Sequence, residues 1–319
     1  MLEKSSDMKP YSSIVLILAM CIFMIRNTQA QQDPQYTQYM YNTMSVNPAY
    51  VGSKGHGVLT ALGRTQWVGF EGAPDTQTLS YDTPVGFRGL GLGFNLVNDK
   101  IGPSHELYLD ANVSYTIETS EEGNLAFGLK LGGRLLNIDW SIGRTQEEGD
   151  ALFGTENNIV NKFLPTVGAG IYYHKPKWYV GLSVPNFLNQ EHYDERLANV
   201  EEAALERMHF FLIAGYVFDL TEDIKFKPAA LLKVASGTPL SLDVSANFMF
   251  VNKFRAGLAW RWGDSVAALL GFQASEALFL GYSYDLTTSS YNVANSGTHE
   301  ILLRYELLRE QRIKSPRFF

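Results

Sequence analysis

The sequence predicts an all-β protein, a 14-stranded antiparallel β-barrel of the outer-membrane type with a short N-terminal helix. Three observations lead to this fold class. Apolar and polar residues alternate with a period of two, as in strands that have one apolar and one polar face. Long and short connections segregate to opposite ends of the predicted strands. Beyond residue 30, no apolar stretch approaches the roughly 20 residues that a membrane-spanning helix needs.

The first 30 residues are expected to form a secretory signal peptide. An apolar run extends from Ile14 to Ile25, and the small residues Thr28 and Ala30 fit a cleavage site before Gln31. An uncleaved anchor is the alternative, but the run is short for a membrane span. Cys21 is the only cysteine, so the mature chain would contain no disulfide, thiolate nucleophile or cysteine-ligated metal. The net charge of −7 disfavours nucleic-acid binding.

Residues 31–55 are predicted to form a plug or docking segment. Asp33 is a suitable N-cap and Pro34 suits the first helical position. Tyrosine and methionine residues then recur at helical spacing, and Asn47-Pro48 ends the pattern. So short a helix must pack against something. We expect it to start in the periplasm and either to plug the lumen or to dock a periplasmic partner, through Tyr36, Tyr39, Met40, Asn47 and Pro48.

Residues 56–308 are predicted to form the transmembrane barrel. In "ELYLDANVSYTIE" at 106–118, leucine, alanine, valine, tyrosine and isoleucine alternate with polar residues. The same pattern recurs in "LSLDVSANFMF" at 240–250 and "HEILLRYEL" at 299–307. The expected strands lie near 57–67, 76–85, 89–99, 105–119, 124–139, 163–174, 178–188, 207–220, 224–235, 240–251, 254–263, 266–274, 278–286 and 297–307.

The connections favour a membrane barrel over a soluble sandwich. Those expected to be long are 68–75, 100–104, 140–162, 189–206 and 287–296, and all of them fall after odd-numbered strands. The connections after even-numbered strands are tight, and with an even number of strands both termini are then expected on the periplasmic side. Four tryptophans near the outer ends of strands and Trp178 near an inner end suit two interfacial girdles.

Charged residues on the polar face are expected to line the lumen. They would either line a water channel, pin an internal plug or form a salt-bridged interior without transport. These residues are Lys130, Arg134, Asp243, Arg255, Arg261, Arg304 and Glu306.

No catalytic or metal site and no cofactor are expected. The six histidines are scattered and show no metal-binding spacing. Ser283 and Asp285 lie two apart on the lumen-facing parity, with His299 on the next strand, but no nucleophile elbow surrounds Ser283. A lipase is therefore a remote alternative.

Two further segments allow more than one interpretation. The loop around Leu197 carries a helix-like stretch among acidic residues, which suits either a cargo-binding lid or a solvated loop helix. The basic tail 309–319 is expected in the periplasm, as a docking peptide or a disordered end.

Several short blocks together resemble one protein family. They are "QQDPQYTQYMYN" at 31–42, "NPAYVGS" at 47–53, "QWVGFEGAPDTQTLSYDTP" at 66–84, "GLGLGF" at 89–94, "GYSYDL" at 281–286, "SGTHEILLRYEL" at 296–307 and the terminal "SPRFF". This ordered set is similar to the type IX secretion system membrane proteins of the PorP/SprF family. Residues 140–210 match no block.

The resemblance implies a non-enzymatic protein of the cell outer membrane that works with the type IX secretion machinery. It also implies a role in export or surface anchoring of a large secreted cargo, such as a gliding adhesin. The partners expected are outer-membrane lipid, the secretion machinery and the cargo. The alternative, by fold analogy, is an outer-membrane channel for small hydrophobic solutes.

Overall fold

The computed structural model describes residues 34–86, 89–142, 158–188, 190–191, 205–206, 208–235, 240–289 and 295–307. The expected signal peptide, the loop stretch around Leu197 and the tail 309–319 lie outside these residues. Within the described part of the chain, no helix is long and apolar enough to span a membrane.

The described chain is built almost entirely of antiparallel strands. They are β1 (Gly57–Thr65), β2 (Asp75–Pro84), β3 (Leu90–Ile101), β4 (Ser104–Glu118), β5 (Asn124–Ile138), β6 (Ile159–His174), β7 (Trp178–Val184), β10 (His209–Tyr216), β11 (Phe218–Asp219), β12 (Ile224–Ala235), β13 (Ser241–Phe250), β14 (Phe254–Arg261), β15 (Ser265–Gln273), β16 (Leu278–Thr287) and β17 (Thr298–Leu307). A separate two-residue pair joins β8 (Gln190–Glu191) to β9 (Leu205–Glu206).

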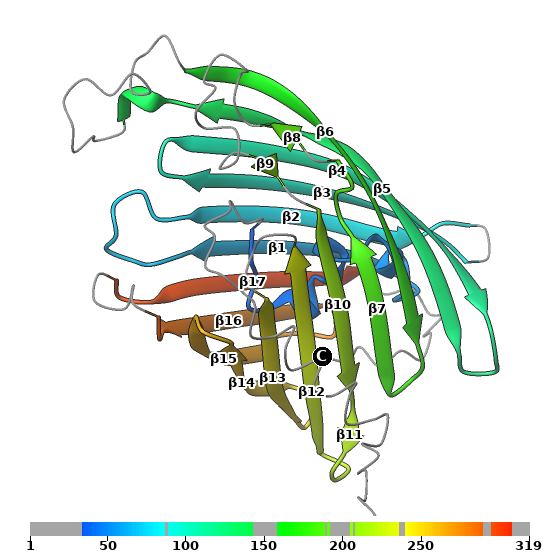
Figure 1. The fold of residues 1–319 in the computed structure, drawn as a ribbon. Coiled ribbons are helices and arrows are strands. Elements are labelled where there is room, and N and C mark those ends of the chain that lie inside the picture. The colour runs from blue at the N-terminus through cyan, green and yellow to red at the C-terminus, as the bar shows by residue number, and fades with distance from the viewer. Residues whose placement is uncertain are drawn as a thin grey trace, which may run out of the picture.

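The sheet closes on itself into a barrel (Figure 1). Neighbouring strands pair in chain order, and β1 pairs with both β2 and β17. On the opposite side β10 bridges β7 and β12. The short β11 continues β10 beyond Val217 and pairs with the same β12. Counted in this way the barrel has 14 strands, which confirms the predicted 14-stranded antiparallel barrel.

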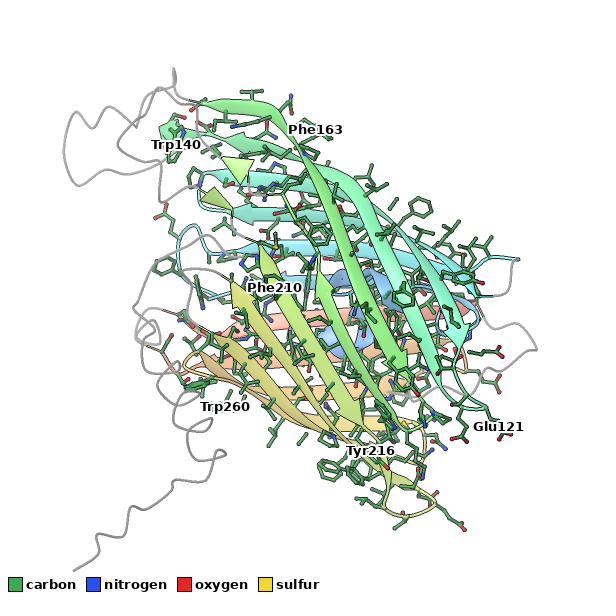
Figure 2. The ribbon with its side chains drawn as sticks, turned by 45° about the vertical axis from the view of Figure 1, so that its right-hand side comes forward. Glu121, Trp140, Phe163, Phe210, Tyr216 and Trp260 are labelled. Atoms are coloured by element: carbon green, nitrogen blue, oxygen red, sulfur yellow. The ribbon has the colours of Figure 1, made fainter. Side chains whose placement is uncertain are left out.

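The polarity of the two barrel faces is that of a membrane barrel. On the outer face Leu109, Leu131 and Leu258 are 62%, 62% and 63% exposed. On the inner face charged side chains such as those of Asp110 and Arg64 are buried. Apolar residues outside and polar residues inside are the reverse of a soluble fold, so the outer face suits lipid. Side chains project from the outer face around the barrel (Figure 2).

The connections at the two ends differ in length, with one exception to the prediction. The strand ends joined by the long connections 139–158, 185–208 and 288–297 lie at one end of the barrel, and those joined by connections of three to five residues, such as 175–177, lie at the other. The third connection, expected to be long, is a two-residue turn at 102–103, because β3 and β4 pair as far as Ile101 and Ser104. By the rule for outer-membrane barrels, the end with the long connections is extracellular.

Strand β6 has an incompletely paired edge on the extracellular side. It pairs with β5 along its length, but with β7 only from Ala169 to His174. Asn161 has a positive φ of 52° next to a register shift, and Lys162 and Pro165 follow. A bulge, a lysine and a proline are features that discourage the addition of another strand to an edge.

The N-terminal segment does not form the predicted α-helix in the described residues. Three separate 3₁₀ turns take its place, η1 (Tyr39–Tyr41), η2 (Thr43–Ser45) and η3 (Pro48–Tyr50). Local side chains compete for the backbone here, since the Ser45 hydroxyl donates to the carbonyl of Asn42. The segment is also buried on all sides, so an amphipathic helix with one polar, solvated face would not fit its surroundings.

Candidate functional site: the N-terminal segment in the lumen

The candidate site is the barrel lumen together with residues 34–56, which we call the lumen segment. It lies inside the ring of strands, drawn in blue in Figure 1. From Tyr36 to Val51 every side chain is buried except that of Ser45, which is half-buried. The barrel interior and the segment therefore share one core, which includes Tyr39, Met44 and Phe279.

Lumen-facing glycines provide the space that the segment occupies. A methyl group at Gly128 would overlap the backbone of Ala49, and one at Gly91 would overlap the carbonyl of Val51. Glycines on β3, β5, β6, β7 and β16 share this property, namely Gly91, Gly93, Gly128, Gly170, Gly181 and Gly281. The pattern "GLGLGF" therefore places glycine where another stretch of backbone approaches closely.

A buried ion cluster holds the beginning of the segment. Both carboxylate oxygens of Glu300 accept hydrogen bonds from backbone amides, that of Thr37 at 3.0 Å and that of Gln38 at 2.8 Å. Arg64 bonds Glu300 and Asp285, each at 2.9 Å. The hydroxyl of Thr37 also donates to Asp285 at 2.6 Å. We call Arg64, Asp285 and Glu300 the Glu300 cluster.

The middle of the segment is fixed by individual hydrogen bonds to three strands. Asn42 donates to Ser80 of β2 at 2.9 Å, and Ser183 of β7 donates to the carbonyl of Val46 at 2.6 Å. Asn47 donates to the carbonyl of Ile171 on β6 at 3.0 Å. Its side-chain oxygen accepts from the amide of Ala49, which caps η3.

A second ion cluster lies where the segment joins β1. Glu306 accepts from Lys54 and contacts His56 at 3.0 Å, and it is 3.1 Å from Arg304. Nearby, the amide of Gly52 donates to Asp82 at 3.0 Å. We call Lys54, His56, Arg304 and Glu306 the Glu306 cluster.

Arginine–aromatic contacts connect the segment to the wall between the two clusters. Tyr41 of the segment packs against Phe279 of β16 at a centroid distance of 4.9 Å. The guanidinium of Arg255 lies 4.2 Å from the centroid of the Phe279 ring, and that of Arg304 lies 5.2 Å from it. Both arginines therefore place their guanidinium groups over the Phe279 ring, and Arg304 also pairs with Glu306.

The structure places the seven predicted lumen charges inside the barrel, mostly in pairs. Lys130 lies 2.9 Å from Asp110, and Arg134 lies 3.1 Å from Glu106. The guanidinium of Arg261 lies 2.6 Å from Asp243. The remaining three, Arg255, Arg304 and Glu306, are those near the segment described above. This arrangement is a salt-bridged interior.

The five predicted segment residues are all buried in the lumen. The hydroxyl of Tyr36 lies 2.8 Å from that of Thr78, and burial raises the pKa of the Tyr36 phenol. Burial likewise raises the pKa of Tyr39. The lumen therefore favours the neutral form of both phenols, because ionisation would place an anion where it is buried from solvent.

Sequence reasoning missed the residues that hold the segment most tightly. Arg64 and Glu300 were not among the predicted lumen charges, and Asp285 was placed on the lumen-facing parity only as a neighbour of Ser283, although all three fall on the inward parity of their strands. Parity alone would have placed them in the lumen. Which of them meet the segment depends on strand order around the barrel, in which β1, β16 and β17 lie side by side.

The described residues show no assembled hydrolase or metal site. Ser283 faces the lumen and is fully buried, whereas His299 bonds Tyr282 at 2.7 Å on the exposed face. No group of three or more potential metal ligands gathers in the described ranges.

Comparison with known proteins identifies the family. A model of the family described as type IX secretion system membrane protein PorP/SprF matches residues 28–305. The chain belongs to the PorP/SprF family. The membership agrees with the residue blocks and with the barrel, and this PorP/SprF chain is an outer-membrane component of the type IX secretion system. No curated protein matches the chain.

Solved structures similar to this PorP/SprF chain are distant. They include the CymD monoaromatic hydrocarbon channel, with a TM-score of 0.49, 11% identity and coverage of 85% of this chain and 94% of that one. The Ralstonia pickettii toluene transporter TbuX has a TM-score of 0.48 and 9% identity, over 83% and 93% of the two chains. Omp33 of Acinetobacter baumannii has a TM-score of 0.47 and 6% identity, over 79% and 98%.

Proposed function

We propose that this PorP/SprF protein assists the export or cell-surface anchoring of a large secreted cargo, such as a gliding adhesin. It would do so as a non-enzymatic barrel that binds partners, with its own N-terminal segment as a plug. The observation that carries the proposal, beyond the family, is the occupied lumen. The segment contacts β2, β6, β7 and β17 from one end of the barrel to the other.

An occupied lumen supports a binding role over a conducting one. The plug is fixed by two ion clusters, and polar groups buried in this way are costly to separate. A secreted polypeptide would have to displace the whole segment to pass through. Partners would then bind to the connections at the two ends of the barrel or to its outer face.

The experiment is deletion of the gene, followed by quantification of type IX cargo on intact cells. We expect a selective loss of one surface cargo, restored by the wild-type gene. Mild-detergent purification of the tagged protein is expected to recover that cargo together with secretion components. Normal surface cargo combined with a defect in uptake of small hydrophobic solutes would contradict the proposal and favour the channel.

A further inference from the structure

The lumen segment runs through the barrel in one direction, and that direction can be read from its contacts. Thr37 and Gln38 bond Glu300, which is two residues from the start of β17. Arg64, in the same cluster, is one residue from the end of β1. Both strand ends adjoin the long connections 66–74 and 288–297, so residues 37 and 38 lie in the extracellular half.

The other end of the segment lies at the periplasmic mouth. Lys54 and His56 contact Glu306, one residue before the end of β17. Gly57, where β1 begins, pairs with Leu307 at the same end. The chain therefore descends from the extracellular half to the periplasm before the first strand starts. A segment that starts in the periplasm, as the sequence suggested, would run the other way.

We propose that the mature N-terminus reaches the extracellular mouth of the barrel. Gln31, the first residue after the predicted cleavage site, precedes Pro34 by three residues, which span up to about 10 Å when extended. Arg64 is one strand residue, a rise of about 3.3 Å, from the extracellular end of β1. Three residues are thus long enough to pass from the Glu300 cluster to the rim.

The charge of the extracellular half complements an N-terminal ammonium group. Arg64 pairs with two carboxylates, those of Asp285 and Glu300. Arg261 also pairs with two, Asp243 at 2.6 Å and Asp264 at 3.3 Å. These two clusters hold four carboxylates and two guanidinium groups, so their excess charge is negative and attracts a cation.

This direction has two consequences. The N-terminus would be presented on the same side as the long connections, within reach of a molecule at the cell surface. The segment would also have to enter the lumen end-on or be enclosed while the barrel closes, because a closed barrel offers no lateral path for it. This inference goes beyond the role in cargo export and holds whether or not that role is correct.

The test is labelling of a single cysteine at the N-terminus on intact cells. Since the mature chain has no cysteine, Gln32→Cys introduces one reactive site. Two matched single-cysteine variants mark the two sides. Glu71→Cys lies in the exposed extracellular turn between β1 and β2, and Glu121→Cys lies in the exposed periplasmic turn between β4 and β5. The probe is a membrane-impermeant maleimide, and a shift in gel mobility on heating checks that each barrel has folded.

We expect Gln32→Cys to be labelled on intact cells to the same extent as Glu71→Cys, with Glu121→Cys labelled only after the outer membrane is permeabilised. Labelling of Gln32→Cys only after permeabilisation, or only after denaturation, would overturn the proposal. Reversed behaviour of the two marker variants would overturn it as well, because the barrel would then be inserted the other way.

A second variant tests the threading itself. A folded fluorescent domain fused directly before Gln31 is expected to keep Thr37 and Gln38 from reaching Glu300, because the domain cannot pass through the lumen, so their amides should lose their protection from hydrogen exchange. The same domain fused after Phe319 is expected to leave that protection intact. Full protection of the two amides in the N-terminal fusion would contradict threading.

Discussion

Replacing Glu300 by glutamine is expected to loosen the beginning of the lumen segment while leaving the barrel closed. Glu300 is fully buried and accepts two backbone amides and Arg64. A hydrogen bond to a charged group contributes about 1.5–3 kcal/mol. Removing one member of a buried ion pair costs about 3–5 kcal/mol.

Glutamine keeps the shape of the side chain and one acceptor oxygen, so we expect the lower end of this range, about 3 kcal/mol. Because 1.4 kcal/mol corresponds to a factor of ten, this loss is equivalent to a factor of about 100 in the local opening equilibrium. The assay is hydrogen exchange of the amides of Thr37 and Gln38 in detergent, measured by mass spectrometry. Those amides should exchange about 100-fold faster in the variant.

The matched control is Glu106→Gln. Glu106 is also a buried lumen carboxylate paired with an arginine, Arg134 at 3.1 Å, but its hydrogen bonds go to Tyr108 and Arg134 rather than to the segment. Exchange at Thr37 and Gln38 should not change in this control. If Glu300→Gln accelerates their exchange less than tenfold, packing rather than the Glu300 cluster holds the segment, and the reasoning is refuted.

Three further predictions concern the same segment. Gly128→Ala is expected to destabilise the packed segment by about 1–3 kcal/mol, because the added methyl group overpacks against Ala49, and so to lower the melting temperature. Gly63→Ala, with open space around it, should leave the melting temperature unchanged. Equal changes in melting temperature for the two variants would argue against a close fit of the segment. In a planar bilayer the purified protein should give no large steady current, and removal of residues 34–52 should produce one; a steady current from the intact protein would argue for an open pore. Tyr36 and Tyr39 have raised pKa values, so the neutral phenols stabilise the fold below about pH 10 and this contribution is lost as the pH rises above it. Absorbance at 295 nm should show these two tyrosines ionising only when the barrel unfolds, and early reversible ionisation of every tyrosine would contradict their burial.

The strands were predictable because the residue pattern within each strand depends on what lies against its two faces. Alternation in β4 and β13 reflects a lumen on one side and lipid on the other, and it appears within a single segment of sequence. The strand number followed from the same pattern. Boundaries were less well predicted where pairing extends a strand, as at Ile159 of β6 and Ile101 of β3.

The candidate site was predictable only in part. Tyr36, Tyr39 and Met40 were singled out by their spacing, and all three are buried. The spacing suggested an α-helix because it carries no information about the walls around the segment. The 3₁₀ turns arise where barrel side chains and local hydroxyls take the backbone groups that a helix would use, as Glu300 does for Thr37 and Gln38.

The sequence by itself determined the class of fold, the strands and the residues that face the lumen, because periodicity and turn chemistry are local properties. Only the tertiary structure decided that Arg64, Asp285 and Glu300 meet around Thr37, since 263 residues separate Thr37 from Glu300. It also decided the direction in which the segment crosses the lumen. The direction of the segment depends on which strands lie next to β1. The barrel closes by pairing β1 with β17, and a local sequence pattern cannot show that these two distant strands are neighbours.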